Sequence, residues 1–117
     1  MGIDIGGAHW AYSGFARFRE RIAEMEGITL KDMYGFGGWM NQDCKQIPWD
    51  TVDTPIKPLL DHSDCDGDLS PEECAQVYPR LAELVEQLED SYDRVQGRIL
   101  VAEMKAAVEG DYRLEFH

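Results

Sequence analysis

Oxygen-bearing side chains alternate along residues 62–73, which read HSDCDGDLSPEE. Carboxylates at every second position, followed by a hydroxyl and a further carboxylate, are the hard ligands that Ca²⁺ prefers. An Asp-Gly pair within the same stretch favours a sharp turn. The candidate metal ligands are His62, Asp64, Asp66, Asp68, Ser70 and Glu73. The spacing therefore predicts a divalent-cation site, with Ca²⁺ as the first choice of ion.

Residues 55 to about 80 resemble a single EF-hand. With Gly67 at the sixth loop position, an apolar Leu69 falls at the eighth and Glu73 at the twelfth, as that motif requires. The departure is at the first position, where His62 stands in place of Asp. The sequence holds no second loop of this kind, although EF-hands usually come in pairs. The resemblance implies a cation-binding loop between two helices.

Two other readings of this loop stay open. Asp residues near a helix N-terminus stabilise the helix dipole and form turns without metal, so the segment could be purely structural. Alternatively, His62, Cys65 and Cys74 could bind Zn²⁺, with Asp64 or Cys44 as a fourth ligand. The second reading lacks the paired C-x₂-C spacing of common zinc sites, so zinc is the weaker cofactor choice.

Nucleophilic catalysis finds little support in the sequence. His62 and Cys65 are three residues apart on the predicted turn, and no residue is identifiable that would orient the base or form an oxyanion hole. The glycine-rich stretch GFGG (35–38) lacks the preceding strand and following Lys of a phosphate-binding loop. We therefore expect a protein that is not an enzyme and has no catalytic residues.

Three long helices and one short helix are expected to position the loop. The pattern of apolar residues predicts a helix over 13–26, a short helix over 55–61 and a helix over 91–109. Ser70, Pro71 and Glu73 form a capping box that begins a helix running to about Leu88, and Pro79 should kink it. The apolar stripes expected on these helices are Phe15, Phe18, Ile22 and Met25; Ile56, Leu59 and Leu60; Cys74, Val77, Leu81, Leu84 and Leu88; and Val95, Ile99, Ala102 and Ala106, with Leu100 and Met104 adjoining the last stripe.

The C-terminal tail has a different period. Tyr112, Leu114 and Phe116 alternate with polar residues, which predicts a short strand whose partner lies near residues 9–12. Residues 39–53 show no period and are expected to form an ordered lid, anchored by Trp39, Met40 and Trp49. We predict a mainly α fold: one domain, residues 1–117, of about four helices with a short two-stranded β ribbon joining the termini.

Charge and composition narrow the choice of partners. The formal net charge of −12 disfavours nucleic acid, which needs clustered basic side chains. Eleven acids lie between Asp61 and Asp93, where Arg80 is the only Lys or Arg, so one strongly negative face is expected. We expect no membrane span and no signal peptide. The odd number of cysteines, three, indicates reduced thiols and a cytoplasmic location.

Several strings resemble small uncharacterised proteins of actinobacteria and their phages. They are HSDCDG with the flanking PLL and LSPEEC, together with YSGF, FRERI, GFGG, PWDTV and LEF. This resemblance implies a bacterial or phage source and a cytoplasmic setting, and it implies no catalytic residues.

These observations lead to two functional expectations. The first is a non-enzymatic binding module that meets a protein partner and binds a divalent cation in its acidic loop. The second is an acidic inhibitor or phage-type accessory protein that occupies a basic surface of a nuclease or defence enzyme, using the acids of residues 61–93. Oligomeric state is not indicated by any feature of the sequence.

Overall fold

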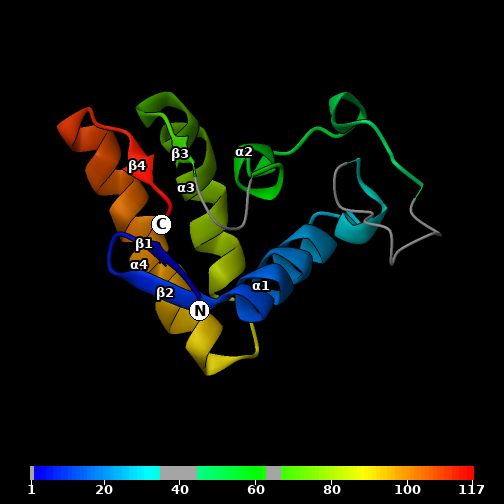
Figure 1. Cartoon of the computed structure of the whole chain (residues 1–117), viewed down its shortest axis with the longest axis horizontal. Coiled ribbons are helices and arrows are strands. Elements are labelled where there is room, and N and C mark those ends of the chain that lie inside the picture. Colours follow the sequence, from blue (N-terminus) through cyan, green and yellow to red (C-terminus); the bar gives the residue numbers. More distant parts are fainter. Residues whose placement is uncertain (1, 35–44, 63–66) are drawn as a thin grey trace.

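The computed structural model describes residues 2–34, 45–62 and 67–117 and shows a mainly α architecture (Figure 1). Two small antiparallel sheets accompany the helices. In chain order the elements are β1 (Gly2–Ile5), β2 (Ala8–Ala11), α1 (Tyr12–Met25), the 3₁₀ turns η1 (Leu30–Asp32) and η2 (Trp49–Thr51), α2 (Lys57–Leu60), β3 (Asp68–Leu69), α3 (Pro71–Val85), α4 (Ser91–Gly110) and β4 (Leu114–Glu115). The predicted fold class is confirmed.

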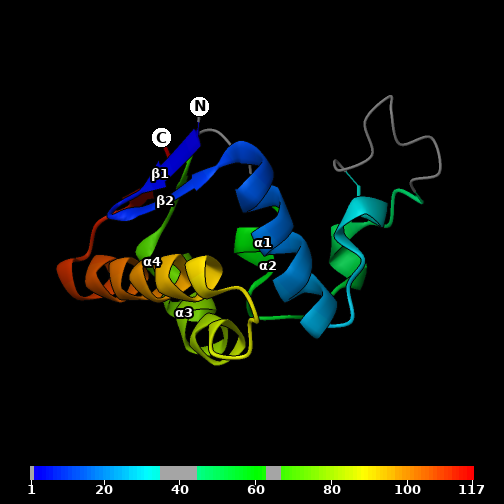
Figure 2. The same cartoon turned by 90° about the horizontal axis from the view of Figure 1, so that it is seen from below.

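The helices α3 and α4 pack side by side, and the β1–β2 hairpin lies over α4 (Figure 2). α1 crosses beside this pair and closes the core. The predicted apolar stripe of α3 is confirmed, because all five of its residues are buried. On α1 the predicted residues Phe15, Phe18 and Ile22 are buried, and Met25 is half-buried. The three predicted residues of α2 are buried as well.

The face of α4 that is buried is not the face that the apolar pattern predicted. Its buried residues are Asp93, Gly97, Leu100, Met104 and Ala107. The predicted stripe lies mostly on the exposed side, with Ile99 half-buried, whereas Leu100 and Met104, which were predicted to adjoin it, are buried. The physical reason is close helix approach: a Cβ built on Gly97 would lie 2.7 Å from a methyl carbon of Val85 on α3. A glycine at the crossing lets the two backbones come together, which outweighs the hydrophobicity of the other face.

The predicted helix starts are confirmed for α3 and are wrong for α1 and α2. α3 begins at Pro71 after Ser70, as predicted, and continues through Pro79 to Val85. α1 begins at Tyr12, and its N-cap residue makes no side-chain hydrogen bond, so the predicted Ser13 cap is wrong. α2 begins at Lys57 rather than at Pro55. Of these three helices, α3 alone begins at a side-chain cap.

The β1–β2 hairpin is tied to α4 through its turn. Gly6 has a φ of +59°, which a glycine adopts without strain. The backbone amide of Gly7 donates a hydrogen bond of 3.1 Å to Oε1 of Glu103. A Cβ on Gly6 would lie 2.3 Å from the Glu103 carboxyl carbon, so the glutamate occupies the space that a side chain would need. The hairpin is thereby held against the helix.

The C-terminal tail does form a strand, but its main partner is not the predicted one. β4 pairs with β3, with Leu114 opposite Leu69. Residues 8–11 pair with β1 instead. The termini are nevertheless joined, because Phe116 forms an isolated antiparallel bridge with Ile5, one strand further along. A period of two predicts a strand, but it carries no information on which edge the strand will use.

The predicted lid falls partly outside the described residues, since Trp39 and Met40 belong to 35–44. Trp49 is described, is 8% exposed, and donates from Nε1 to the carbonyl of Tyr34 at 2.9 Å. The 3₁₀ turns η1 and η2 lie together at one end of the molecule (cyan and green in Figure 1). In the described part of the chain, no helix has the length and apolar character needed to cross a membrane.

Candidate functional site

The second half of the loop at 62–73 is folded as its sequence predicts. Gly67 has a φ of +93°, which suits the sharp turn at the sixth position. Leu69 is buried within β3. The Ser70 hydroxyl accepts a hydrogen bond of 3.1 Å from the Glu73 amide, and the Glu73 carboxylate accepts one of 2.9 Å from the Ser70 amide. The capping box therefore occupies one carboxylate oxygen of the candidate ligand Glu73.

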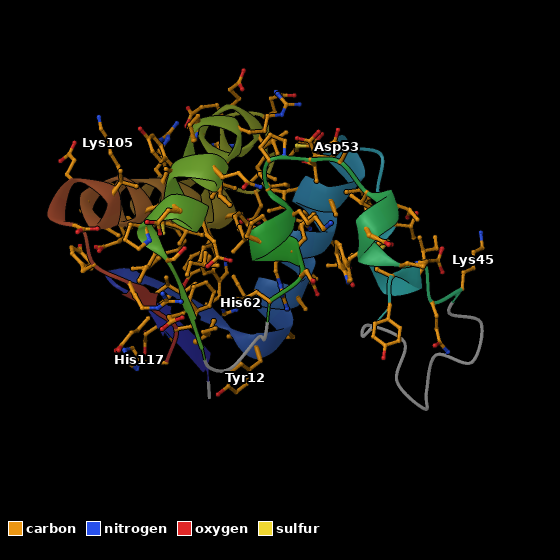
Figure 3. The ribbon with its side chains drawn as sticks, turned by 90° about the horizontal axis from the view of Figure 1, so that it is seen from above. Tyr12, Lys45, Asp53, His62, Lys105 and His117 are labelled. Atoms are coloured by element: carbon orange, nitrogen blue, oxygen red, sulfur yellow. The ribbon has the colours of Figure 1, made fainter. Side chains whose placement is uncertain are left out.

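His62, labelled in Figure 3, contacts Asp68 in the second half of the loop and Phe116 in the C-terminal tail. Its Nε2 lies 3.0 Å from the carbonyl oxygen of Asp68, and since a carbonyl only accepts, the ring nitrogen donates. The imidazole also packs against the Phe116 ring, with ring centroids 4.0 Å apart and the ring planes tilted by 32°. In a calcium loop the seventh-position carbonyl is a metal ligand. Here the first and seventh positions are joined by a hydrogen bond between protein groups.

The Asp68 side chain, in contrast to its backbone carbonyl, is hydrogen-bonded to Arg113. Arg113 donates to it through Nε and Nη2, both at 2.9 Å, in the two-bond geometry that Arg and carboxylates favour. The hydrogen bonds from Arg113 lower the pKa of Asp68, and the nearby positive charge acts in the same direction. This pair crosses from β3 to the residue before β4. It therefore holds the tail on the loop.

A buried arginine lies beneath the start of the loop. Arg19 is 3% exposed and donates to the carbonyl oxygens of His62 and, at 3.4 Å, of Leu60. Its guanidinium also lies 4.8 Å from the centre of the Phe15 ring. A positive charge in this position opposes a divalent cation nearby, because charges interact strongly where water is excluded. The sequence places Arg19 four residues after Phe15, at the edge of the apolar face of α1.

Some of the predicted metal ligands lie within the described residues and others lie outside them. Asp64, Cys65 and Asp66 lie outside them, so the calcium site itself stays a prediction. Cys74 is a free thiol buried in the core, and burial raises its pKa to about 11, which disfavours the thiolate that zinc binds. Within 2–34, 45–62 and 67–117, no three His, Cys, Asp or Glu side chains are grouped closely enough to hold a metal ion.

A second candidate site lies between α1 and the turn that joins α3 to α4. We call it the α1–α4 groove, and it has two hollows that share Arg21 and Asp90. The acidic hollow has a volume of about 650 Å³. Its lining residues are Arg21, Glu24, Met25, Gln87, Leu88, Glu89 and Asp90. The lining thus combines three carboxylates with two apolar side chains and one arginine.

The other hollow, which we call the arginine hollow, has a volume of about 430 Å³. Its lining residues are His9, Trp10, Ala11, Gly14, Arg17, Arg21, Asp90, Tyr92 and Asp93. The two hollows follow each other along α1, from Gly14 and Arg17 to Glu24 and Met25.

A buried carboxylate supports the middle of the groove. Asp93 is 6% exposed and accepts hydrogen bonds of 3.1 Å from Trp10 Nε1 and from Arg21 Nη1. Its backbone amide donates to the Asp90 side chain at 3.0 Å, which caps α4. A buried charge needs such partners to offset its lost hydration. The groove is therefore built on a fixed ion pair that links α1 to the start of α4.

Comparisons of this chain with protein-family models, with curated proteins and with solved structures found no match in any of the three. The resemblance to small actinobacterial and phage proteins stays a prediction.

Sequence reasoning missed the groove because its parts are far apart in the chain. Asp93 was one of eleven acids in the run from 61 to 93, with no feature of composition to mark it as buried. One local signal was present, since Asp90 precedes the helix at the position of an N-cap. Arg21 and Trp10 belong to the first quarter of the chain, and neither has a periodic relation to Asp93.

Proposed function

We propose that this protein is a non-enzymatic binding module that takes a basic segment of a protein partner in its acidic hollow. The single observation that carries the proposal is the lining of a hollow of about 650 Å³, which combines Glu24, Glu89 and Asp90 with Met25 and Leu88 and contains one basic side chain, Arg21. A Lys or Arg side chain has the matching form, because its stem is apolar and its head is charged.

The charge distribution supports the same site. Two other acids near the end of α3 already have basic partners: Glu86 accepts two hydrogen bonds of 2.7 Å from Arg98, and Glu83 lies 3.6 Å from Arg80. No basic side chain pairs with Glu24 or Glu89 within the described part of the chain. With a net charge of −12, the protein should also attract a basic partner at long range.

The narrower role of an acidic inhibitor, which occupies a basic surface of a nuclease or defence enzyme, is one form of this proposal. The same hollow would then receive a basic side chain from that surface. A cytoplasmic location belongs to the proposal too, since a buried free thiol and an odd number of cysteines suit a reducing compartment. Calcium in the loop at 62–73 is a separate proposal, tested below by the metal alone.

The test is a titration of the protein with a fluorescent peptide rich in Lys and Arg, followed by anisotropy at several salt concentrations. We expect saturable binding that weakens as salt rises. The same peptide with Glu in place of its basic residues should not bind.

Two double variants locate the contact. Glu24→Gln with Glu89→Gln removes two charges from the acidic hollow, and binding should weaken at least tenfold. Glu20→Gln with Glu109→Gln removes two exposed charges outside it and serves as the control. Equal loss in both double variants would show a general charge effect and would sink the assignment to this hollow. Absence of binding by the native protein would refute the proposed function.

A further inference from the structure

Residues 112–117, which we call the tail, lie between two strands from distant parts of the chain. On one side β4 pairs with β3, and the Phe116 amide donates to the Gly67 carbonyl at 2.9 Å. On the other side Asp4 of β1 exchanges two backbone hydrogen bonds with His117. Figure 1 shows β4 beside β3 and the end of the chain next to β1. The tail therefore joins the two small sheets.

The side chains of the tail match this position on both faces. Leu114 and Phe116 are 4% and 2% exposed, so they belong to the core. Arg113, on the outer face, donates two hydrogen bonds of 2.9 Å to Asp68. The position between β1 and β3 thus accepts an extended segment with two apolar side chains on one face and a basic side chain on the other. The tail of a second copy of this chain has the same sequence and meets the same requirement.

A short link joins the tail to α4. The helix ends at Gly110, and the next residue, Asp111, has a φ of +54°, a conformation that costs more for a residue with a side chain than for glycine. The Tyr112 amide donates back to the Ala107 carbonyl at 3.1 Å, so the chain turns sharply at this point. With an ordinary negative φ at Asp111 the turn opens, and the tail leaves its own molecule. Short links under backbone strain favour the exchange of a segment between two copies.

We propose that the tail is an exchangeable strand: at high protein concentration, the tail of each copy inserts between β1 and β3 of a second copy. The contacts of the tail within one molecule are made again between two molecules, so the exchange changes the link at Asp111 and little else. The net charge of −12 makes two copies repel each other, and salt should therefore favour the dimer. This inference is independent of the basic-segment function.

The first experiment refolds the native protein from urea at micromolar and at millimolar concentration. Size-exclusion chromatography with light scattering then gives the mass. We expect monomer at the lower concentration, dimer at the higher one, and a larger dimer fraction as salt rises. After dilution the dimer should return to monomer slowly, because both tails must detach first. A protein that stays monomeric under all these conditions overturns the proposal.

Two substitutions at the link should shift the equilibrium in opposite directions. Asp111→Gly removes the cost of the positive φ in the monomer, so the dimer fraction should fall at least threefold. Asp111→Pro excludes a positive φ, so the dimer should predominate. Gln46→Gly is the matched control, because Gln46 is the other non-glycine residue with a positive φ in the described part of the chain and lies outside the tail and its link. It should leave the dimer fraction as in the native protein.

A charge exchange tests whether the dimer forms through the tail. Asp68→Arg in one chain and Arg113→Asp in another each place like charges between β3 and the tail of the same molecule. In a refolded mixture each tail finds the opposite charge on β3 of the other chain. We expect at least fivefold more dimer in the mixture than in either variant alone. A single chain with both substitutions restores the pair within one molecule and should behave as the native protein does.

The outcomes decide the proposal even if one variant fails to fold, which circular dichroism will show. If Asp111→Pro is unfolded, Asp111→Gly and the charge exchange still test the link and the tail separately. A dimer that responds neither to substitution of Asp111 nor to mixing uses another surface, and tail exchange is then wrong. Peptide binding at the acidic hollow is measured on the monomer, so failure of tail exchange leaves that function standing.

Discussion

The loop at 62–73 and the α1–α4 groove contrast in how they use their charged groups. In the loop the described polar groups bond to the protein itself: His62 to the Asp68 carbonyl, Asp68 to Arg113, and Glu73 to Ser70. In the groove the buried Asp93 is bonded internally, but the carboxylates around it line an open hollow. We call the loop with residues 113–117 the tail corner.

The difference shows that a metal-ligand pattern in the sequence does not reveal whether the candidate ligand groups are free to bind a metal or are hydrogen-bonded to other groups of the protein. Five residues of the tail corner match a calcium loop in type and spacing, and His62 takes the place of the sixth, yet those that the structure describes stabilise the chain. The groove has no motif, yet its lining combines charge, apolar contact and depth. We therefore expect changes in the tail corner to alter stability and changes in the groove to alter binding.

The largest effect should come from Phe116→Ala. Phe116 is buried and packs against the His62 ring, and its backbone amide donates a hydrogen bond of 2.9 Å to the Gly67 carbonyl. Truncation of a buried Phe typically costs about 3–5 kcal/mol. Urea denaturation should show a loss of that size in the free energy of unfolding. A loss below about 1 kcal/mol would mean that the tail contributes little to the tail corner.

His62→Asp should lower stability by about 2 kcal/mol in the absence of metal, because it removes one hydrogen bond and one aromatic contact. It also restores a carboxylate at the first loop position. Added Ca²⁺ should then raise the melting temperature of the variant more than that of the native protein, and EDTA should reverse the rise. An equal or larger rise in the native protein would contradict our reading of His62 as a substitute for the metal.

Ser70→Ala should cost about 1 kcal/mol, the usual contribution of an N-cap hydroxyl. The measurement is again urea denaturation, with Ser91→Ala as the control. Ser91 is exposed at the first residue of α4, where Asp90 is the cap. If both variants lost the same free energy of unfolding, the capping box at Ser70 would not be the source of the loss.

Acid should weaken the link between β3 and the tail. Arg113 lowers the pKa of Asp68 from its ordinary 3.8, so the ionised carboxylate is favoured in the folded state. The stabilisation is present above about pH 4 and is lost as pH falls through the lowered pKa. Because the pair is exposed, the effect should be small. Arg113→Gln should reduce the difference in melting temperature between pH 5 and pH 2.5; an unchanged difference would count against the pair.

The smallest change in stability is expected from the groove. Glu24→Gln with Glu89→Gln should alter the free energy of unfolding by less than about 0.5 kcal/mol, as is usual for exposed sites, while peptide binding falls. Asp93→Ala is the contrasting case, because it leaves Trp10 Nε1 and Arg21 without their buried acceptor. If the double variant destabilised the protein as Asp93→Ala does, the two regions would not differ as proposed.

Local signals in the sequence predicted local structure well. Ser70, Pro71 and Glu73 begin α3 as expected, because the capping box needs only groups within four residues. The apolar stripes of α1, α2 and α3 were correct, since each buries the only strongly apolar face that its helix has. The stripe of α4 was wrong because hydrophobicity alone does not reveal that Gly97 is placed at the crossing with Val85.

Long-range pairings account for what could not be predicted. Asp93 is 83 residues from Trp10 and 72 residues from Arg21, and only the fold brings them together. The tail was predicted as a strand, but its choice of β3 depends on where α4 ends. The candidate metal ligands were chosen by spacing, which describes the order of groups along a chain and not which of them bond to one another.

The bridge between β1 and residue 116 also has a consequence for the order in which the domain folds. The amide and carbonyl of Asp4 bond to the carbonyl and amide of His117, at 3.0 and 2.9 Å. Strands β1 and β3 therefore each keep an edge of unpaired backbone until residues 114–117 dock on them. Contacts between residues so far apart in the sequence form late, so we expect the docking of residues 114–117 to be a late step of folding.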